Sequence, residues 1–359
     1  MLIQSSVRYP VIEVVSQTPA GRLNEDTWLV MQGGPLGERI VLAAIDGATT
    51  RLTPPPLQRY LDTLPIRLTP AAYSARVIRD SLARLCAEGL FDDPRALLVE
   101  ANADLGRALI SLFGSLTLEG MCFPEDVYAP LAHDPRLVRL GLPVSVATLA
   151  EYDPAAHELQ YAHVGDTLLL IVYEDGRVNI PMRAEDAVMD SDLKRTALRL
   201  REYYPDLSMR ELLQQPEIRT MNLHNALHHN YVDEHGLPQP GQGIGALNGL
   251  PELRYFVQTG RVSMERVRLV CAMTDGLEWP ASAQEVFTDD PDEAKKLQRD
   301  RRLFMGAQIA DLGLRGYLSL LRQAEAADAD HERYPRMKTH DDATGVLLGW
   351  TGVAYQTVV

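Results

Sequence analysis

Acidic residues stand at the ends of several apolar runs in this sequence. The run "IVLAAIDG" reaches Asp46, and "VRLVCAMTDG" reaches Asp275. A buried strand tolerates a carboxylate at its end only where something compensates the charge. Aspartate is common at strand ends and turns, so one such residue predicts little, whereas the repetition indicates a shared site. The other members are Glu25 and Asp26 before an apolar run, Asp166 between two runs, and Asp341 and Asp342 before a late run.

Carboxylates gathered at one rim would repel one another strongly unless cations lay between them. Oxygen ligands without clustered cysteine or histidine favour a hard ion, Mg²⁺ or Mn²⁺, over zinc. A pair of such ions about 3.5–4 Å apart would activate water for in-line attack on a phosphate ester. A bridging ligand must approach both ions closely, and a neighbouring glycine permits this. Asp46, which Gly47 follows, is therefore the predicted bridge.

The elements that must position these residues can be read from the hydrophobic pattern. Runs rich in β-branched and aliphatic residues predict strands at 26–31, 39–45, 145–152, 158–164, 167–173, 254–259, 267–274, 344–350 and 353–358. Helical spacing predicts helices over 78–85, 98–112 and 291–325, with a bend or break in the last at Gly313 or Gly316. Strands clustered in hairpins with long helices between the clusters favour a layered α+β domain.

We expect one domain over residues 1–359. A length of 359 residues would suggest two domains, but no segment is long and polar enough to be a linker between them. Residues 180–250 differ from the rest, with short helical stretches and the glycine-rich "PQPGQGIGALNG". We interpret this segment as an insertion or flap over one edge of the domain. Whether it gates the site is left open.

Composition narrows the class of protein. The chain is 46% apolar and 23% charged, typical of a soluble globular protein. The first residues lack the pattern of a secretory signal, and the apolar run "LLLIV" is too short to span a bilayer. Three scattered cysteines indicate reduced thiols in the cytoplasm. A formal charge of −14 opposes binding to nucleic acid. The oligomeric state is not indicated.

One basic run stands out against this negative charge. The segment "KKLQRDRR" covers residues 295–302 within the predicted last helix. Such a run is usually a solvated helix face. The alternative is a docking surface for an acidic phosphopeptide, and the sequence leaves both interpretations open.

The order of the motifs resembles a known family. "NED", "DG", "SVAT", "HVGD", "TDGLEW" and "DDAT" follow one another before a closing apolar run. This order is similar to that of the metal-dependent protein serine/threonine phosphatases of type 2C, particularly their bacterial members. The resemblance implies a four-layer β-sandwich of two antiparallel sheets flanked by helices. It also implies hydrolysis of phosphoserine and phosphothreonine in a phosphorylated protein, through water activated by two metal ions.

The resemblance further implies which residues hold the two divalent cations, Mn²⁺ or Mg²⁺. Glu25, Asp46 and the carbonyl group of Gly47 would bind one ion. Asp46, Asp275 and Asp341 would bind the other, mostly through water. Asp46 and Asp275 are then the residues on which catalysis depends most.

Three further acidic positions receive roles from the same resemblance. Asp26 would contact the metal ligands and hold them in position. Asp166, together with Asp275, would hold a third, weaker ion. Asp341 is preferred to Asp342 as a ligand, because the family pattern has a threonine three positions after its ligand and this chain has one there.

The chain also departs from the family pattern. Where the family commonly has His-Gly-Gly after Asp-Gly, this sequence has Ala48, Thr49 and Thr50, so a proton for the leaving group must come from water or another residue. Arg22 is the candidate for binding the substrate phosphate, although it is out of register with the family's arginine. These departures keep a second hypothesis open, a catalytically weak or inactive relative that recognises a phosphorylated partner.

Overall fold

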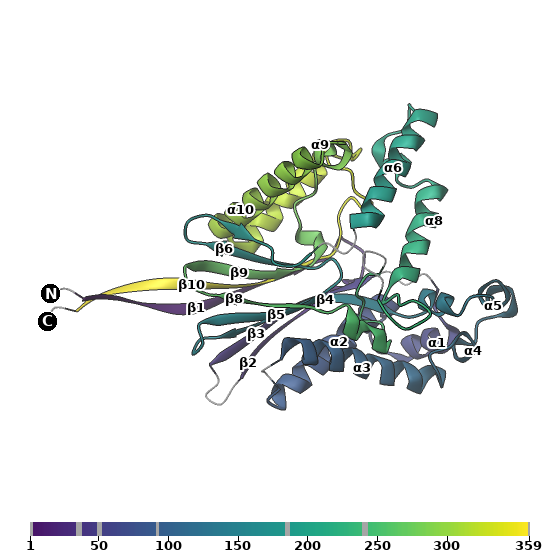
Figure 1. The fold of residues 1–359 in the computed structure, drawn as a ribbon, viewed down its shortest axis with the longest axis horizontal. Coiled ribbons are helices and arrows are strands. Elements are labelled where there is room, and N and C mark those ends of the chain that lie inside the picture. Colours follow the sequence, from purple (N-terminus) through teal and green to yellow (C-terminus); the bar gives the residue numbers. More distant parts are fainter. Residues whose placement is uncertain are drawn as a thin grey trace.

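Two antiparallel sheets pack face to face, and helices cover the outer face of each (Figure 1). The computed structural model describes residues 3–33, 38–48, 52–90, 93–183, 187–238 and 243–357. Thr49 and Thr50 lie outside the described residues. The predicted four-layer α+β sandwich is confirmed, since both sheets have five strands and every strand pair is antiparallel.

The strand order places non-consecutive strands side by side. The first sheet contains, in order, β1 (Ile3–Gln17), β10 (Ala343–Thr357), β9 (Val267–Met273), β6 (Leu168–Tyr173) and β7 (Val178–Asn179). The second contains, in order, β2 (Thr27–Gly33), β3 (Arg39–Ala48), β4 (Val144–Asp153), β5 (Glu158–Val164) and β8 (Gln258–Ser263). The ends of the chain therefore pair with each other in the first sheet.

Strand β3 is an unbroken apolar run because both of its faces are buried. Successive side chains of a strand point to opposite faces. Leu42 and Ala44 face the other sheet and contribute to the core of the sandwich. Val41 and Ile45 face the helical layer. That layer is built from α1 (Pro55–Thr63), α2 (Pro70–Ala87) and α3 (Pro94–Phe113).

The opposite helical layer is α10 (Pro291–Ala326), which lies over β6 and β9 (Figure 1). The helix breaks at Gly313, where φ is 68° and ψ is 177°. The carboxylate of Glu13 on β1 then caps the second half, accepting hydrogen bonds from the backbone N–H groups of Leu314 at 3.0 Å and Arg315 at 3.1 Å. The predicted break is confirmed at Gly313.

Residues 180–250 contain α6 (Ala187–Tyr203), α7 (Met209–Leu212) and α8 (Pro216–Asn225). In Figure 1, α6 and α8 stand at the end of the sandwich opposite to the two termini. Ala197, Leu212 and their neighbours form small apolar clusters that include Met337, from the segment before β10. The backbone N–H of Met209 also donates to the carboxylate of Glu332 at 2.9 Å. These helices are thus attached to the segment that leads into "KTHDDAT".

Short helices complete the described chain. They are α4 (Leu118–Met121), α5 (Glu125–Leu131), α9 (Ala283–Phe287) and the 3-10 turns η1 (Pro135–Leu140), η2 (Ala226–His228), η3 (Pro251–Tyr255) and η4 (Asp275–Leu277). Across the described residues, none of these helices or the longer ones is both long and apolar enough to cross a membrane.

One strand of the structure was not predicted, and two stretches predicted as strands differ from the structure. Strand β1 was not predicted, because Pro10 and charged residues interrupt its pattern; an edge strand tolerates proline since its outer N–H groups need no partner. The strand predicted at 254–259 was wrong at its start, where η3 begins at Pro251, and β8 starts only at Gln258. The two strands predicted at 344–358 are one strand, β10, because β1 pairs along its whole length.

Candidate functional site

Strand direction brings the predicted acidic residues to one end of the sandwich. In the second sheet, β3 ends beside the start of β2, with Ile45 opposite Thr27. In the first sheet, β9 ends at Met273, opposite the starts of both β6 and β10. Asp46 lies within β3, near its end. The other acidic residues lie just beyond these strand ends: Glu25, Asp26, Asp166, Asp275, Asp341 and Asp342.

Asp46 and Asp275 meet across the two sheets. Their side chains are close enough for a hydrogen bond, which would require a proton on one of the two carboxyl groups. Burial and the neighbouring carboxylate of Asp26 raise the pKa of Asp46 well above its ordinary value. Burial and Asp341 raise the pKa of Asp275 to about 6. The close approach of the two carboxyl groups thus favours their protonated forms.

The glycines after these aspartates are needed for close approach. A Cβ atom on Gly47 would lie 2.6 Å from the carbonyl oxygen of Glu25 and 2.9 Å from that of Ala71. A Cβ atom on Gly276 would overlap the carbonyl oxygen of Asp342. Only glycine lets the acidic loops come this close to the ends of β3 and β9. Gly47 thus brings the backbone of Glu25 next to Asp46.

Asp26 is positioned behind this pair. Its side chain is 8% exposed, and its Oδ2 accepts a hydrogen bond from the hydroxyl of Thr274 at 2.7 Å. Burial raises the pKa of Asp26 well above its ordinary value, although the bond from Thr274 opposes the shift. The hydroxyl of Thr274 in turn accepts from the backbone N–H of Thr344 at 3.0 Å. Asp26 therefore holds Thr274, the residue before Asp275, in place. The threonine in "TDG" could have indicated this contact, but it was not used for the prediction.

The adjacent aspartates at the start of β10 have different surroundings. Asp342 accepts a hydrogen bond from the backbone N–H of Glu25 at 2.7 Å and another from the hydroxyl of Thr18. Asp341 instead forms a 2.6 Å ion pair with Lys338 and raises the pKa of Asp275. Both aspartates raise the pKa values of Glu25 and Asp26, but only Asp341 also raises that of Asp275. This difference favours Asp341 as the candidate ligand.

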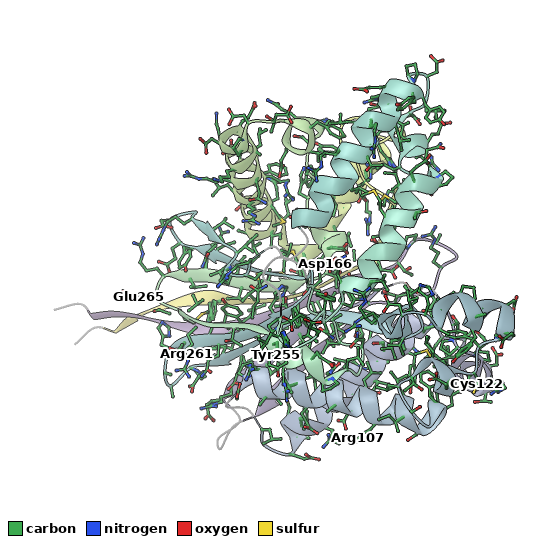
Figure 2. All side chains as sticks on the ribbon, turned by 45° about the vertical axis from the view of Figure 1, so that its right-hand side comes forward. Arg107, Cys122, Asp166, Tyr255, Arg261 and Glu265 are labelled. Atoms are coloured by element: carbon green, nitrogen blue, oxygen red, sulfur yellow. The ribbon has the colours of Figure 1, made fainter. Side chains whose placement is uncertain are left out.

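Glu25 and Asp166 lie on either side of the central pair. The side chain of Glu25 is partly buried, and burial raises its pKa although a hydrogen bond with Thr69 opposes this. Asp166, labelled in Figure 2, is exposed in the turn between β5 and β6. It contributes to the field that raises the pKa of Asp46, and it lines a cavity of about 210 Å³ together with Asp275.

Lys338 supplies a positive charge inside the acidic cluster. Burial alone would lower its pKa, but the carboxylates of Asp341, Asp275 and Asp46 outweigh burial and raise it. The sequence analysis missed this residue. No sequence pattern around Lys338 indicates where it lies, because its position depends on the path of the loop before β10.

The residues present suit a hard divalent cation in their chemistry but do not enclose one. Apart from Lys338, the charged side chains that converge are carboxylates, the ligands that Mg²⁺ and Mn²⁺ prefer. Within the described ranges, however, no three acidic, histidine or cysteine side chains are close enough together to hold an ion. The ammonium group of Lys338 offsets part of the charge of these carboxylates. A bound cation would therefore compete with Lys338.

Arg22 is exposed beside this cluster. It lines a cavity of about 570 Å³ with Lys338, Arg210 of α7 and His340. Guanidinium and ammonium groups gathered in one cavity suit an anion such as a phosphate group. The insertion therefore contributes a basic residue next to the acidic cluster.

We expect Lys338→Met to tighten the binding of Mg²⁺ or Mn²⁺ about tenfold, because it removes a positive charge with which the cation must compete. Isothermal titration calorimetry on the whole chain measures this affinity. Lys296→Met is the matched control, since Lys296 is exposed on α10 and forms no part of the cluster. Unchanged or weaker binding in Lys338→Met would mean that Lys338 supports the site rather than blocking it.

The fold and the site together describe a two-sheet sandwich with a carboxylate cluster at one end. No family model and no curated protein matches the sequence. Solved structures align with nearly the whole chain, but their sequence identities and TM-scores are low. RsbX in complex with magnesium is 10% identical, covering 98% of this chain and 100% of that one, with a TM-score of 0.41. A bacterial serine phosphatase is 11% identical, covering 95% and 98%, with a TM-score of 0.45.

The serine/threonine phosphatase Stp1 from Staphylococcus aureus is 12% identical, covering 94% of each chain, with a TM-score of 0.43. Similarities of this size assign no activity, because one fold hosts many functions. The case for a function rests on the side chains at the end of the sandwich.

Proposed function

We propose that this chain is a metal-dependent phosphatase that removes phosphate from phosphoserine or phosphothreonine in a cytoplasmic phosphoprotein. The observation that carries the proposal is the meeting of Asp46 and Asp275 across the two sheets, with raised pKa values and further carboxylates around them. Clustered acidic groups with strongly shifted pKa values are typical of functional sites. Repulsion among these carboxylates destabilises the folded chain, and a positively charged ligand would relieve it.

Each carboxylate has a place in this proposal. Asp46 lies at the centre, so it would contact both of two Mg²⁺ or Mn²⁺ ions. Glu25 and the Gly47 carbonyl would complete one set of ligands, and Asp275 and Asp341 the other. When bound, such ions would activate water for attack on a phosphate ester and balance the charge of its oxygens. Asp166, beside Asp275 in one cavity, would hold a weaker third ion.

The basic residues beside the cluster would orient the substrate. Arg22 and Arg210 line the cavity that Lys338 shares, so they would bind the oxygens of the phosphate group. Lys338 pairs with Asp341 in the absence of an ion, and once displaced it could turn toward this cavity. Ala48 supplies no proton donor, so an aryl phosphate, whose leaving group needs little protonation, is the most suitable first substrate.

A second candidate function is recognition of a phosphorylated partner without catalysis. The ion pair between Lys338 and Asp341, at 2.6 Å, favours it, because a cluster already neutralised by an ammonium group needs no metal to be stable. On this hypothesis the cavity with Arg22 would still bind phosphate.

Hydrolysis of a generic aryl phosphate by the purified chain distinguishes the two. We expect turnover with Mn²⁺ or Mg²⁺ and its loss on adding a chelator. If calorimetry shows that the chain binds the ion yet no turnover occurs, the phosphatase proposal is wrong and the recognition module is favoured. Metal-independent turnover that persists in chelator would contradict both.

A further inference from the structure

The basic run at 295–302 divides between two faces of α10. Lys295, Gln298, Arg299 and Arg302 are three or four positions apart, so they share one face of the helix. Arg301 faces elsewhere and is 12% exposed, held by Glu278 at 2.6 Å and by Glu285 at 3.0 Å. Only Arg301 is thus used to attach the helix to the chain beneath it.

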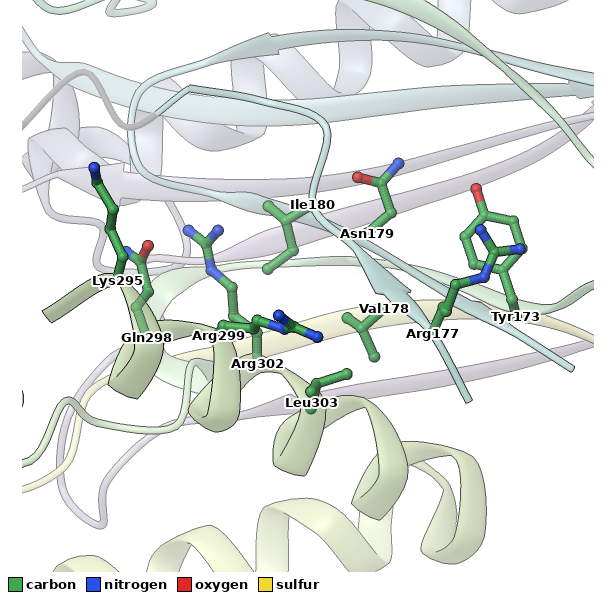
Figure 3. Close-up of a pocket in the computed structure, with 10 residues that line it drawn as sticks. All are labelled: Tyr173, Arg177, Val178, Asn179, Ile180, Lys295, Gln298, Arg299, Arg302 and Leu303. Atoms are coloured by element: carbon green, nitrogen blue, oxygen red, sulfur yellow. The ribbon is translucent and has the colours of Figure 1, made fainter. Parts of the chain in front are cut away.

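The shared face of α10 forms one wall of a groove. Figure 3 shows the groove, which Lys295, Arg299 and Arg302 line from the helix; Arg302 extends toward Val178 of β7. Its volume is about 540 Å³. Arg177 and Asn179 line the opposite wall, and no acidic side chain is among the lining residues. In a chain of net charge −14, this groove is a local concentration of positive charge.

Close contact between α10 and β7 ends the groove at one side. A Cβ atom on Gly306 would collide with the side chain of Val178, so the glycine allows the helix to lie directly on the strand. Arg302 lies one turn before Gly306 on the same helix face. The groove is therefore built by the fold, with a floor fixed by Val178 and a rim of basic side chains.

Two of the basic side chains lack partners within the described part of the chain. Arg299 and Arg302 form no ion pair there, and the Nε of Arg302 is buried without a hydrogen-bond acceptor. A buried donor without an acceptor is unfavourable, and a bound anion would satisfy it. Arg302 thus points independently to an anionic ligand.

The groove adjoins the carboxylate site. Ile180, Gln298 and Arg302 line both the groove and the 210 Å³ cavity that contains Asp166 and Asp275. An extended chain with one residue at the carboxylate site would therefore have its neighbouring residues at the groove.

We propose that this groove binds acidic residues that flank the phosphorylated residue of the substrate protein. The proposal rests on the proposed phosphatase function for the position of the phosphate group, but the binding itself requires no catalysis. Charge complementarity and the unsatisfied Nε of Arg302 favour an anionic segment, and the adjoining carboxylate cavity favours a peptide that continues into the site.

The test compares a phosphoserine peptide flanked by glutamates with the same peptide flanked by alanines. The chain should have a higher kcat/KM for the acidic peptide, because its KM for that peptide is lower. Arg299→Glu should lower this preference about tenfold, since it turns an attraction at an exposed site into a repulsion. Arg315→Glu is the matched control, because it makes the same charge change on an exposed part of α10 outside the groove, and it should keep both the preference and aryl phosphate turnover.

Fluorescence anisotropy with the unphosphorylated acidic peptide separates this proposal from the function it rests on. Binding that Arg299→Glu weakens and Arg315→Glu does not supports the groove even if no hydrolysis is found. Equal effects of both variants would overturn the proposal in favour of bulk charge. Binding of a short RNA or of anionic vesicles at this groove, in preference to the peptide, would also overturn it.

Discussion

Asp46→Asn should lower kcat for metal-dependent aryl phosphate hydrolysis by about a thousandfold or more while the chain stays folded. The amide cannot carry the negative charge that two cations would share, and the lost electrostatic stabilisation acts mainly in the transition state. Circular dichroism and thermal unfolding report the fold, and steady-state kinetics with saturating Mn²⁺ report kcat. In the chelated chain, the variant should be at least as stable as the native one, because a buried acidic group with a raised pKa has been removed.

Asp153→Asn is the control for this prediction. Asp153 ends β4, the strand paired with β3, but it lies at the opposite end of the sandwich and forms a 3.0 Å ion pair with Arg39. We expect turnover to be unaffected. If Asp46→Asn kept its turnover, Asp46 would not be the central residue of the site, and the two-ion mechanism would be wrong.

Asp275→Asn should change how stability depends on pH. A carboxyl group with a higher pKa in the folded chain than in the unfolded chain holds its proton more tightly when folded, so the free energy of unfolding falls as pH rises between the two values. For Asp275 these values are 3.8 and about 6. Without metal, the native chain should lose about 3 kcal/mol relative to Asp275→Asn over this range. Chemical denaturation from pH 2 to 7 in chelator measures the difference.

Asp104 provides a control with the opposite sign. Burial would raise its pKa, but hydrogen bonds from Ser81, Arg84 and Arg107 lower it to about 2. Stability contributed by Asp104 is present above its unfolded value and is lost as pH falls toward 2, so Asp104→Asn should become relatively less stable as pH rises. If the native chain and Asp275→Asn instead keep a constant difference across the range, Asp275 does not titrate as its surroundings indicate.

Much of the fold could be predicted because its central strands are buried on both faces. β3 and β9 lie between a second sheet and a helical layer, so their sequences are almost wholly apolar and easily recognised. β1 could not be predicted in this way. It lies at an edge and contains Pro10, and its pairing partner β10 is more than 300 residues away in the sequence, so only tertiary contact defines it.

For the candidate site, the sequence was sufficient to find the carboxylates but not their surroundings. Asp46, Asp166 and Asp275 follow or precede strands, and strand ends on one side of a sandwich must lie together. Lys338 lies in a loop whose path is set by contacts with the insertion, so its arrival beside Asp341 could not be foreseen. The residues that would bind metal stay predictions until an ion is titrated into the chain.

The contact between Asp46 and Asp275 also connects the two sheets of the sandwich. Each residue belongs to a different sheet, so anything bound there joins the sheets at one end, while the other end carries the termini (Figure 1). A ligand that binds there only in the folded chain stabilises the fold in proportion to the logarithm of its concentration. The stability of the sandwich would therefore report how much of the ligand is present.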